Sequence, residues 1–258
     1  MTGALRAEWT KLRTVAATGW LMLATITATV GLGTIVALAV TYRSTGPGQD
    51  IPKLSLVGIQ LGQAIIAILA VQTISGEYST GMIRVTLTAI PRRPTLLAAK
   101  AAILTALVLT AGAVAVLGSV LVGRLILPGH GFTAAHGYAL LSLSHGPTLR
   151  AAAGSVLYLG LIALLSLGVA TAVRESAVAI GLVLGLLYLF PILAALVTDP
   201  QLKRHLQQIA PMTAGLAVQA TTNLGRLPIA PWAGLAVLAG WAAAAVLVGG
   251  LLLRWRDA

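Results

Sequence analysis

Residues 56–74 read LVGIQLGQAIIAILAVQTI, and residues 75–94 read SGEYSTGMIRVTLTAIPRRP. The first stretch is a long apolar run, and the second is a polar segment that leads into another apolar run. About 20 consecutive apolar residues are enough for a helix to cross a bilayer. Because this alternation continues along the chain, it predicts an all-α membrane protein.

The composition agrees with this fold class. Of the 258 residues, 58% are hydrophobic and only 9% are charged, whereas about 25% of the residues of a soluble domain are charged. The net charge is +11, but the basic residues lie at the ends of apolar runs, which is typical of contacts with anionic lipids. We therefore expect membrane lipids as partners and no nucleic acid. The absence of cysteine excludes disulfides, thiolate metal sites and thiol catalysis.

Six apolar runs are candidate transmembrane helices, and together they form a single transmembrane domain over residues 1–258. An even number of spans places both termini on one side. The densest basic clusters precede the first span and separate the second from the third, which predicts cytoplasmic termini in the cell membrane. A short polar turn, Arg174-Glu175-Ser176, separates the fourth span from the fifth. The predicted spans are residues 19–41, 56–74, 96–127, 151–173, 177–197 and 232–253.

Residues 1–18 predict a helix that lies in the membrane interface. On a helical wheel, Leu5, Trp9 and Leu12 share a narrow apolar arc, and cations cover the opposite side. The alternative is that the cations only set the topology.

The segment between the second and third spans predicts a short amphipathic helix over residues 80–89. Gly76 and Gly81 permit a sharp change of direction, and Pro91 ends the helix. Arg92, Arg93 and Lys100 are expected to hold this end in the cytosol. The alternative is an ordinary basic loop in which Glu77 pairs with a nearby arginine.

Further short patterns predict local structure. Asp199 can cap a helix that begins at Pro200, and Pro147 can begin a short helix that leads into the fourth span. Two small-xxx-small pairs, Gly58/Gly62 and Gly181/Gly185, favour close helix packing. The amides within the spans either tie helices together or line a pathway; they belong to Gln60, Gln63 and Gln72.

An enzymatic function is not indicated. Every histidine and aspartate lies in a predicted loop or at a chain end, and the chain has no phosphate loop. The spacing of His130, His136 and His145 matches no metal-ligand pattern. No charged residue lies deep in a predicted span, which argues against a proton- or sodium-coupled carrier.

Five stretches, distributed over the whole chain, carry a resemblance to a known family: LRAEWTKLRT, GEYSTGMIRVTLTAIPRRPTLLAAKA, PTLRAAAGSVLYLGLIALLSLGVATAVRESA, PWAGLAVLAGWAAAAVL and LLLRWRDA. In their order and spacing, the chain resembles the membrane subunits of type 2 ABC exporters, in particular the small six-span permeases of actinobacteria.

The resemblance implies a permease that works as a homo- or heterodimer with separate cytoplasmic ABC ATPase subunits, which would bind ATP and Mg²⁺. This chain itself would hold no cofactor, metal or catalytic residue. Its residues 5–14 would be the elbow helix, residues 80–89 a coupling helix that docks on the ATPase, and residues 199–231 re-entrant helices. The implied coupling residues are Glu77, Thr80, Gly81, Met82, Arg84, Leu87 and Thr88.

The expected cargo is hydrophobic or amphipathic, such as a drug, lipid or peptide. Two other functions stay open at this point. One is a non-transporting membrane scaffold or immunity protein, and the other is a stand-alone secondary carrier or channel.

Overall fold

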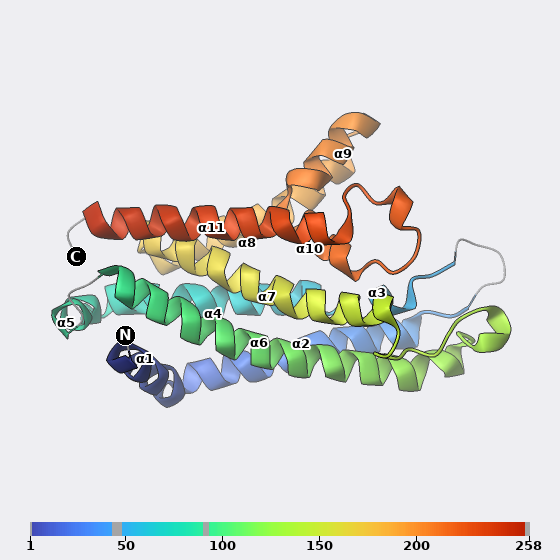
Figure 1. Ribbon diagram of the computed structural model, residues 1–258, viewed down its shortest axis with the longest axis horizontal. Coiled ribbons are helices and arrows are strands. Elements are labelled where there is room, and N and C mark those ends of the chain that lie inside the picture. Colours follow the sequence, from blue (N-terminus) through green and yellow to red (C-terminus); the bar gives the residue numbers. More distant parts are fainter. Residues whose placement is uncertain (1, 43–47, 90–92, 256–258) are drawn as a thin grey trace.

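Six long helices run side by side along the length of the molecule (Figure 1). The computed structural model describes residues 2–42, 48–89 and 93–255, and in these ranges the regular structure is helical throughout. All six helices are long and apolar enough to cross a membrane, which confirms the six predicted spans. They are α2 (Ala16–Ala39), α4 (Ile59–Ser79), α6 (Arg93–Ile126), α7 (Gly146–Val173), α8 (Ser176–Leu196) and α11 (Pro231–Trp255).

The short elements gather at the two ends of the bundle. At one end, α1 (Thr2–Thr14) and α5 (Met82–Ala89) lie near the last turn of α11, and we call this the proximal end (Figure 1). We call the opposite end distal. Towards it lie α3 (Ile51–Ser55), η1 (Leu127–His130), η2 (Ala134–His136), α9 (Pro200–Ile209), α10 (Pro211–Leu216), η3 (Ala217–Gln219) and η4 (Leu224–Arg226).

Helix α7 forms the centre of the bundle and packs against α4, α6, α8 and α11. Glycines let the backbones approach closely at these contacts. A Cβ atom at Gly168 of α7 would lie 2.4 Å from the Ala245 carbonyl carbon of α11, and one at Gly58 would lie 1.8 Å from the Thr29 carbonyl oxygen of α2. The second span therefore uses its small-xxx-small pair for packing, as predicted.

The other small-xxx-small pair lies in a different environment. A Cβ atom at Gly181 or Gly185 of α8 would meet no atom of the described residues within 4 Å. These two glycines therefore form no close helix contact within the part of the chain that the structure describes.

The polar turn and the helix cap that the sequence predicts are both present. Arg174 adopts a left-handed φ of 69°, and the Glu175 carboxylate accepts hydrogen bonds from the first backbone N–H groups of α8. Asp199 caps α9 in the same way, with Pro200 as the first helical residue. Pro147 lies in the first turn of α7, so the predicted short helix is continuous with the fourth span.

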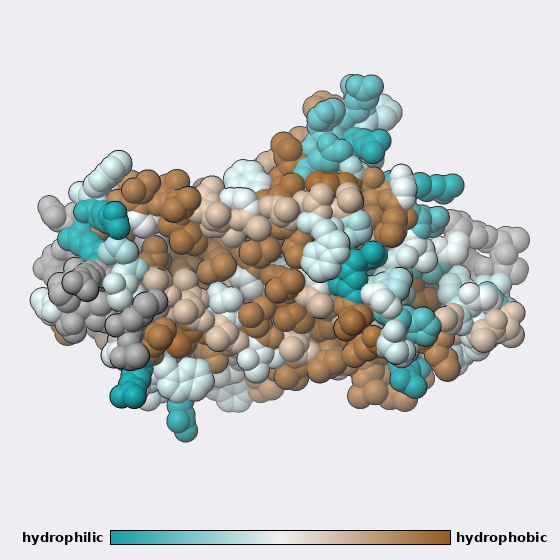
Figure 2. Space-filling view, in the orientation of Figure 1, coloured by the Kyte–Doolittle hydropathy of each residue, from teal (hydrophilic) through white to brown (hydrophobic). Residues whose placement is uncertain are grey.

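The surface has the distribution expected of a multi-pass membrane protein. Figure 2 shows hydrophobic side chains over the middle of the bundle and hydrophilic ones gathered towards both ends. Tryptophans are exposed near the limits of this apolar zone, Trp20 and Trp255 on the proximal side and Trp232 on the distal side. Tryptophan is enriched at membrane–water interfaces. The surface thus supports the membrane assignment independently of helix length.

Candidate functional site

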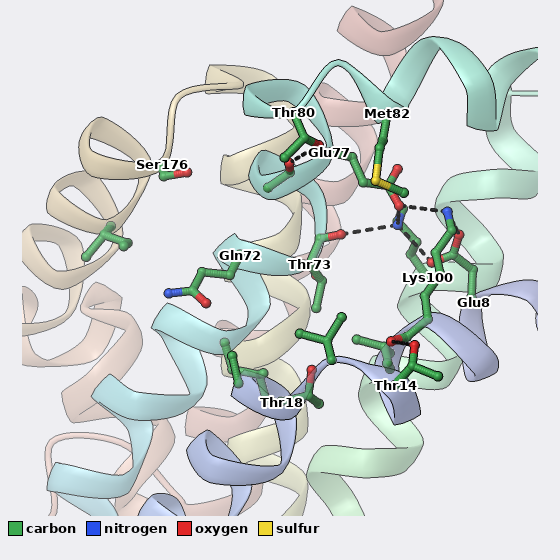
Figure 3. Close-up of a pocket in the computed structure, with 17 residues that line it drawn as sticks. Glu8, Thr14, Thr18, Gln72, Thr73, Glu77, Thr80, Met82, Lys100 and Ser176 are labelled. Atoms are coloured by element: carbon green, nitrogen blue, oxygen red, sulfur yellow. Dashed lines mark hydrogen bonds and ion pairs between the residues drawn. The ribbon is translucent and has the colours of Figure 1, made fainter.

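Four charged side chains from three helices meet at the proximal end, and we call them the proximal ion cluster: Glu8 and Lys11 of α1, Glu77 of α4 and Lys100 of α6 (Figure 3). The Lys100 Nζ atom lies 2.8 Å from Glu8 Oε2 and 2.7 Å from Glu77 Oε1. The Lys11 Nζ atom lies 2.9 Å from Glu77 Oε1 and 3.1 Å from Glu8 Oε1. Each lysine therefore bridges both glutamates.

The hydrogen-bond donors of the cluster are fully used. An ammonium group has three N–H donors. Lys100 directs its third one to the Thr73 carbonyl oxygen at 3.2 Å, and Lys11 directs its third one to the Thr86 hydroxyl of α5 at 3.1 Å. Of the four carboxylate oxygens, only Glu77 Oε2 has no partner among the described residues. The formal charges of the cluster sum to zero.

The cluster is buried, which makes its pairing energetically important. The side chains of Glu8 and Lys100 are 2% exposed, that of Glu77 is 9% exposed and that of Lys11 is 31% exposed. Removing one partner of a buried ion pair leaves an uncompensated charge and costs about 3–5 kcal/mol. The cluster therefore holds α1, α4 and α6 in one arrangement.

Lys11, which lies outside the six spans, stays charged at neutral pH. Burial alone would lower the pKa of Lys11, but a hydrogen bond to Glu77 and the negative charges of Glu8 and Glu77 outweigh it and raise this pKa above its ordinary value. The ammonium form is therefore the one that bonds to Thr86.

Local backbone features place these side chains. Glu8 and Lys11 are three residues apart, so they share one face of α1, and Val15 in an extended conformation separates α1 from α2. At Gly81 a φ of 70° turns the chain between α4 and α5, so Gly81 forms the predicted change of direction. Gly76 lies within α4 instead.

Helix α5 has two different faces. Ile83 and Thr86 are buried against the bundle, whereas Met82 is 47% exposed and Val85 is 69% exposed. Thr80, Gly81 and Thr88 are also exposed. Of the other predicted coupling residues, the side chains of Arg84 and Leu87 lie outside the described part of the chain, as do residues 90–92 and with them Pro91.

A cavity of about 630 Å³ adjoins the ion cluster. It is bordered by α1, the start of α2, α4, α6, α8 and Met82, and its walls are mainly apolar. Figure 3 shows Lys100 and Glu8 on one side of this space and Ser176 on the opposite side. Gln72 also lines the cavity, and Figure 3 shows its side chain apart from Lys100 and Glu8.

The other two predicted amides differ from each other. Gln63 is buried, accepts a hydrogen bond from the Tyr158 hydroxyl and donates one to the Met212 sulfur at 3.3 Å, which ties α4 to α7 and α10. Gln60, three residues earlier, has an exposed side chain. Within this chain Gln63 thus serves helix packing.

Two residues of the cluster differ from the expectation. Lys100 was expected to help hold this end in the cytosol, but its side chain is buried in the ion cluster, where two carboxylates from other helices compensate its charge. Glu8 had no predicted role. On α1, Leu5 and Leu12 are half-buried and Trp9 is exposed. The sequence contained one indication of this cluster. Glu8 and Lys11 are three residues apart, in a chain with only six carboxylate side chains.

The histidines lie apart from this site. His136 Nδ1 is 2.7 Å from the Gly131 carbonyl oxygen, and its ring stacks on Tyr42. Within the described ranges, no three histidine, aspartate or glutamate residues are grouped as metal ligands.

Comparison with known proteins adds no assignment. No protein-family model matches the chain, and no curated protein matches it significantly.

Proposed function

We propose that this chain is the membrane subunit of an ATP-driven ABC exporter, which works as a dimer with separate cytoplasmic ATPase subunits that bind ATP and Mg²⁺. In this proposal the proximal end faces the cytoplasm of the cell, and both termini lie there. The observation that carries the proposal is the attachment of α5, a short helix with an exposed apolar face, to the buried ion cluster.

The outward face of α5 has the character of a docking surface. At the proximal end, the apolar side chain of Val85 is 69% exposed, and that of Met82 is 47% exposed and also borders the cavity. Apolar residues that are exposed together and flanked by polar groups are typical of protein interfaces. Thr80 and Thr88 supply the polar surroundings here. A groove on a cytoplasmic ATPase would bury this face.

The inward face of α5 links that surface to the spans. The Thr86 hydroxyl accepts a hydrogen bond from Lys11, and Lys11 contacts Glu77 of α4 and Glu8 of α1. A displacement of α5 therefore acts on α1, α4 and, through Lys100, on α6. An ATPase can shift the equilibrium between two permease states only if it contacts them differently. In this proposal, α5 is the element that makes these contacts. In this proposal, Glu77 connects α4 to the ion cluster and does not itself contact the ATPase.

The experiment places a photo-crosslinking amino acid at position 85 of the full chain in native membranes. We expect a crosslink to a cytosolic subunit that carries a phosphate loop, and a purified complex that hydrolyses ATP. Val85→Asp should abolish the complex. The same crosslinker at the exposed position Val248 of α11 is the matched control and should not capture that subunit.

Two results would overturn the proposal. One is a crosslink from position 85 to a partner whose purified complex with this chain does not hydrolyse ATP, which would favour a scaffold or immunity protein. The other is transport by the purified chain alone in vesicles, which would favour a stand-alone carrier or channel.

A further inference from the structure

Helix α9 projects sideways from the bundle (Figure 1). Its base is anchored inside the apolar zone. The Trp241 indole N–H of α11 donates a hydrogen bond of 2.9 Å to the Ile209 carbonyl oxygen, about 14 Å along α11 from the exposed Trp232. Figure 2 shows hydrophobic side chains at the base of this projection and hydrophilic ones at its tip. The helix therefore spans the change from the apolar zone to the polar distal end.

The side chains of α9 divide into two faces. Leu202, Leu206 and Ile209 are spaced by four and three residues and share one stripe. Leu202 is 51% exposed and Ile209 is 52% exposed. Lys203 and Arg204 lie outside this stripe, and both are exposed. An apolar stripe with cations on the other side is typical of a helix that lies in the membrane interface.

One hydrogen bond shows how these faces are oriented. The Gln208 side-chain amide donates a hydrogen bond of 2.7 Å to the Pro228 carbonyl oxygen, in the segment between η4 and α11 at the distal end. Arg204 lies one turn before Gln208 and shares its side of the helix. Leu202 and Leu206 lie about 120° and about 160° around the helix from Gln208. The apolar stripe therefore faces away from the polar distal segment.

Charge favours lipid head groups as the partner of the cations. Among the described residues, neither Lys203 nor Arg204 forms an ion pair, and the nearest carboxylate along the chain, that of Asp199, caps the helix. The phosphates of anionic lipids lie at the limit of the apolar zone and attract lysine and arginine. A second copy of this chain would offer few anions, because it has 17 lysines and arginines and only six acidic residues.

We propose that α9 is an interfacial helix that binds anionic lipids in the leaflet at the distal end. Its stripe of Leu202, Leu206 and Ile209 inserts among the acyl chains, and Lys203 and Arg204 bind the head-group phosphates. The interaction holds the distal end at a fixed depth in the bilayer. It requires no ATPase, so it does not depend on the proposed exporter function.

The first test locates the stripe by spin labelling of the full chain in nanodiscs that contain phosphatidylglycerol and phosphatidylcholine. Leu202→Cys and Arg204→Cys form a matched pair, because both positions are exposed and lie on different faces of α9. The chain has no other cysteine. Oxygen concentrates in hydrocarbon, and a nickel chelate stays in water. The ratio of oxygen to nickel collisions should be at least fivefold higher at position 202 than at position 204.

Two results of this test would overturn the inference. A label at position 202 that neither reagent reaches would mean that a second copy or another protein covers the stripe. A label there that the nickel chelate reaches as readily as it reaches position 204 would mean that the stripe lies in water.

The second test measures the head-group preference. A bimane fluorophore on Leu202→Cys, in phosphatidylcholine nanodiscs, is quenched by added doxyl-labelled phosphatidylglycerol or doxyl-labelled phosphatidylcholine. Each cation near an anionic lipid contributes about a fivefold preference. Half-maximal quenching should therefore require at least fivefold less of the labelled phosphatidylglycerol.

A matched pair of double variants assigns this preference to α9. Lys203→Gln with Arg204→Gln should abolish it. Lys53→Gln with Arg226→Gln removes the same charge from two other exposed positions at the distal end and should leave it unchanged. Equal quenching by the two lipids, or a preference that survives the loss of both α9 cations, would refute the binding of anionic lipids by α9.

Discussion

Lys100 shows how a single side chain can connect distant parts of this protein. It lies about two turns into α6, and its ammonium contacts carboxylates from α1 and α4 at 2.8 and 2.7 Å. In a mainly apolar chain, such a charge is stable only when opposite charges accompany it into the interior. Lys100 therefore has a structural function in addition to any effect on topology.

Lys100→Met should destabilise the protein strongly. The variant leaves Glu8 and Glu77 buried with one lysine between them, so we expect a loss of about 3–5 kcal/mol in the free energy of unfolding. Denaturant unfolding in mild detergent measures it. Lys53→Met, at an exposed position of α3, is the control and should change stability little. Equal stability of the two variants would contradict a stabilising cluster.

Glu175 provides a pH-dependent contribution at the start of α8. Hydrogen bonds from the backbone N–H groups of Val178 and Ala177 lower the pKa of Glu175 below its ordinary value. The cap therefore stabilises the folded state above the unfolded pKa, and this contribution is lost as the pH falls through the folded pKa. The Tm of the wild type should exceed that of Glu175→Gln at pH 7, and the difference should shrink towards pH 3. A constant difference would rule out the charged cap.

At the scale of the element, α5 depends on one turn and one hydrogen bond. Gly81 adopts a φ that side chains disfavour, which lets the chain turn sharply after α4. The Thr86 hydroxyl then meets Lys11. The turn at Gly81 and the inward contact of Thr86 thus place α5, and Met82 and Val85 stay exposed.

Two neighbouring glycines should respond to alanine with opposite signs. Gly81→Ala places a side chain at φ 70° and should cost about 1–2 kcal/mol. Gly76→Ala lies within α4 with nothing within 4 Å of its Cβ position, so higher helix propensity should add about 0.5–1 kcal/mol. Unfolding midpoints of both variants test this contrast, and shifts of the same sign would refute the assigned backbone conformations.

The contact between α2 and α4 predicts a further difference. Gly58→Ala would place its Cβ atom 1.8 Å from the Thr29 carbonyl oxygen, so the helices must separate, at a cost of about 1–3 kcal/mol. Gly31→Ala is the control, because Gly31 lies on α2 and a Cβ atom there would meet nothing within 4 Å. The Tm should fall for Gly58→Ala only. A fall for neither variant would mean that these helices pack differently.

At the scale of the whole molecule, two polar ends enclose an apolar zone (Figure 2). The ends differ in construction. The proximal end holds the ion cluster and the exposed face of α5. At the distal end, the Asp50 carboxylate accepts hydrogen bonds from Thr221 and Thr222, and the Arg150 guanidinium donates one to the Ala220 carbonyl oxygen. The proposed function requires the proximal end to face the cytoplasm.

Cysteine labelling tests this orientation, and the chain contains no cysteine that would interfere. Thr88→Cys on α5 and Lys203→Cys on α9 are both at exposed positions. In intact cells, a membrane-impermeant maleimide should label Lys203→Cys at once and Thr88→Cys only after permeabilisation. The reverse pattern would invert the topology and exclude α5 as a cytoplasmic docking element.

Features that depend on neighbours along the chain could be predicted from local sequence patterns. Apolar run length predicted the six spans, Asp199 before Pro200 predicted a helix cap, and Gly81 predicted the turn before α5. Each of these is a property of a single helix or turn, so local patterns were sufficient. The small-xxx-small spacing predicted packing at Gly58 and Gly62, where it occurs, but the same spacing at Gly181 and Gly185 forms no close contact among the described residues.

Which charges meet depends on how the helices pack. Glu8, Glu77 and Lys100 are separated by many residues along the chain, and no local pattern relates them. The sequence therefore predicted only that Lys100 helps to hold this end in the cytosol, and it gave no role to Glu8. Their burial is favourable only because three helices bring opposite charges within hydrogen-bond distance, and that condition exists only in the packed bundle.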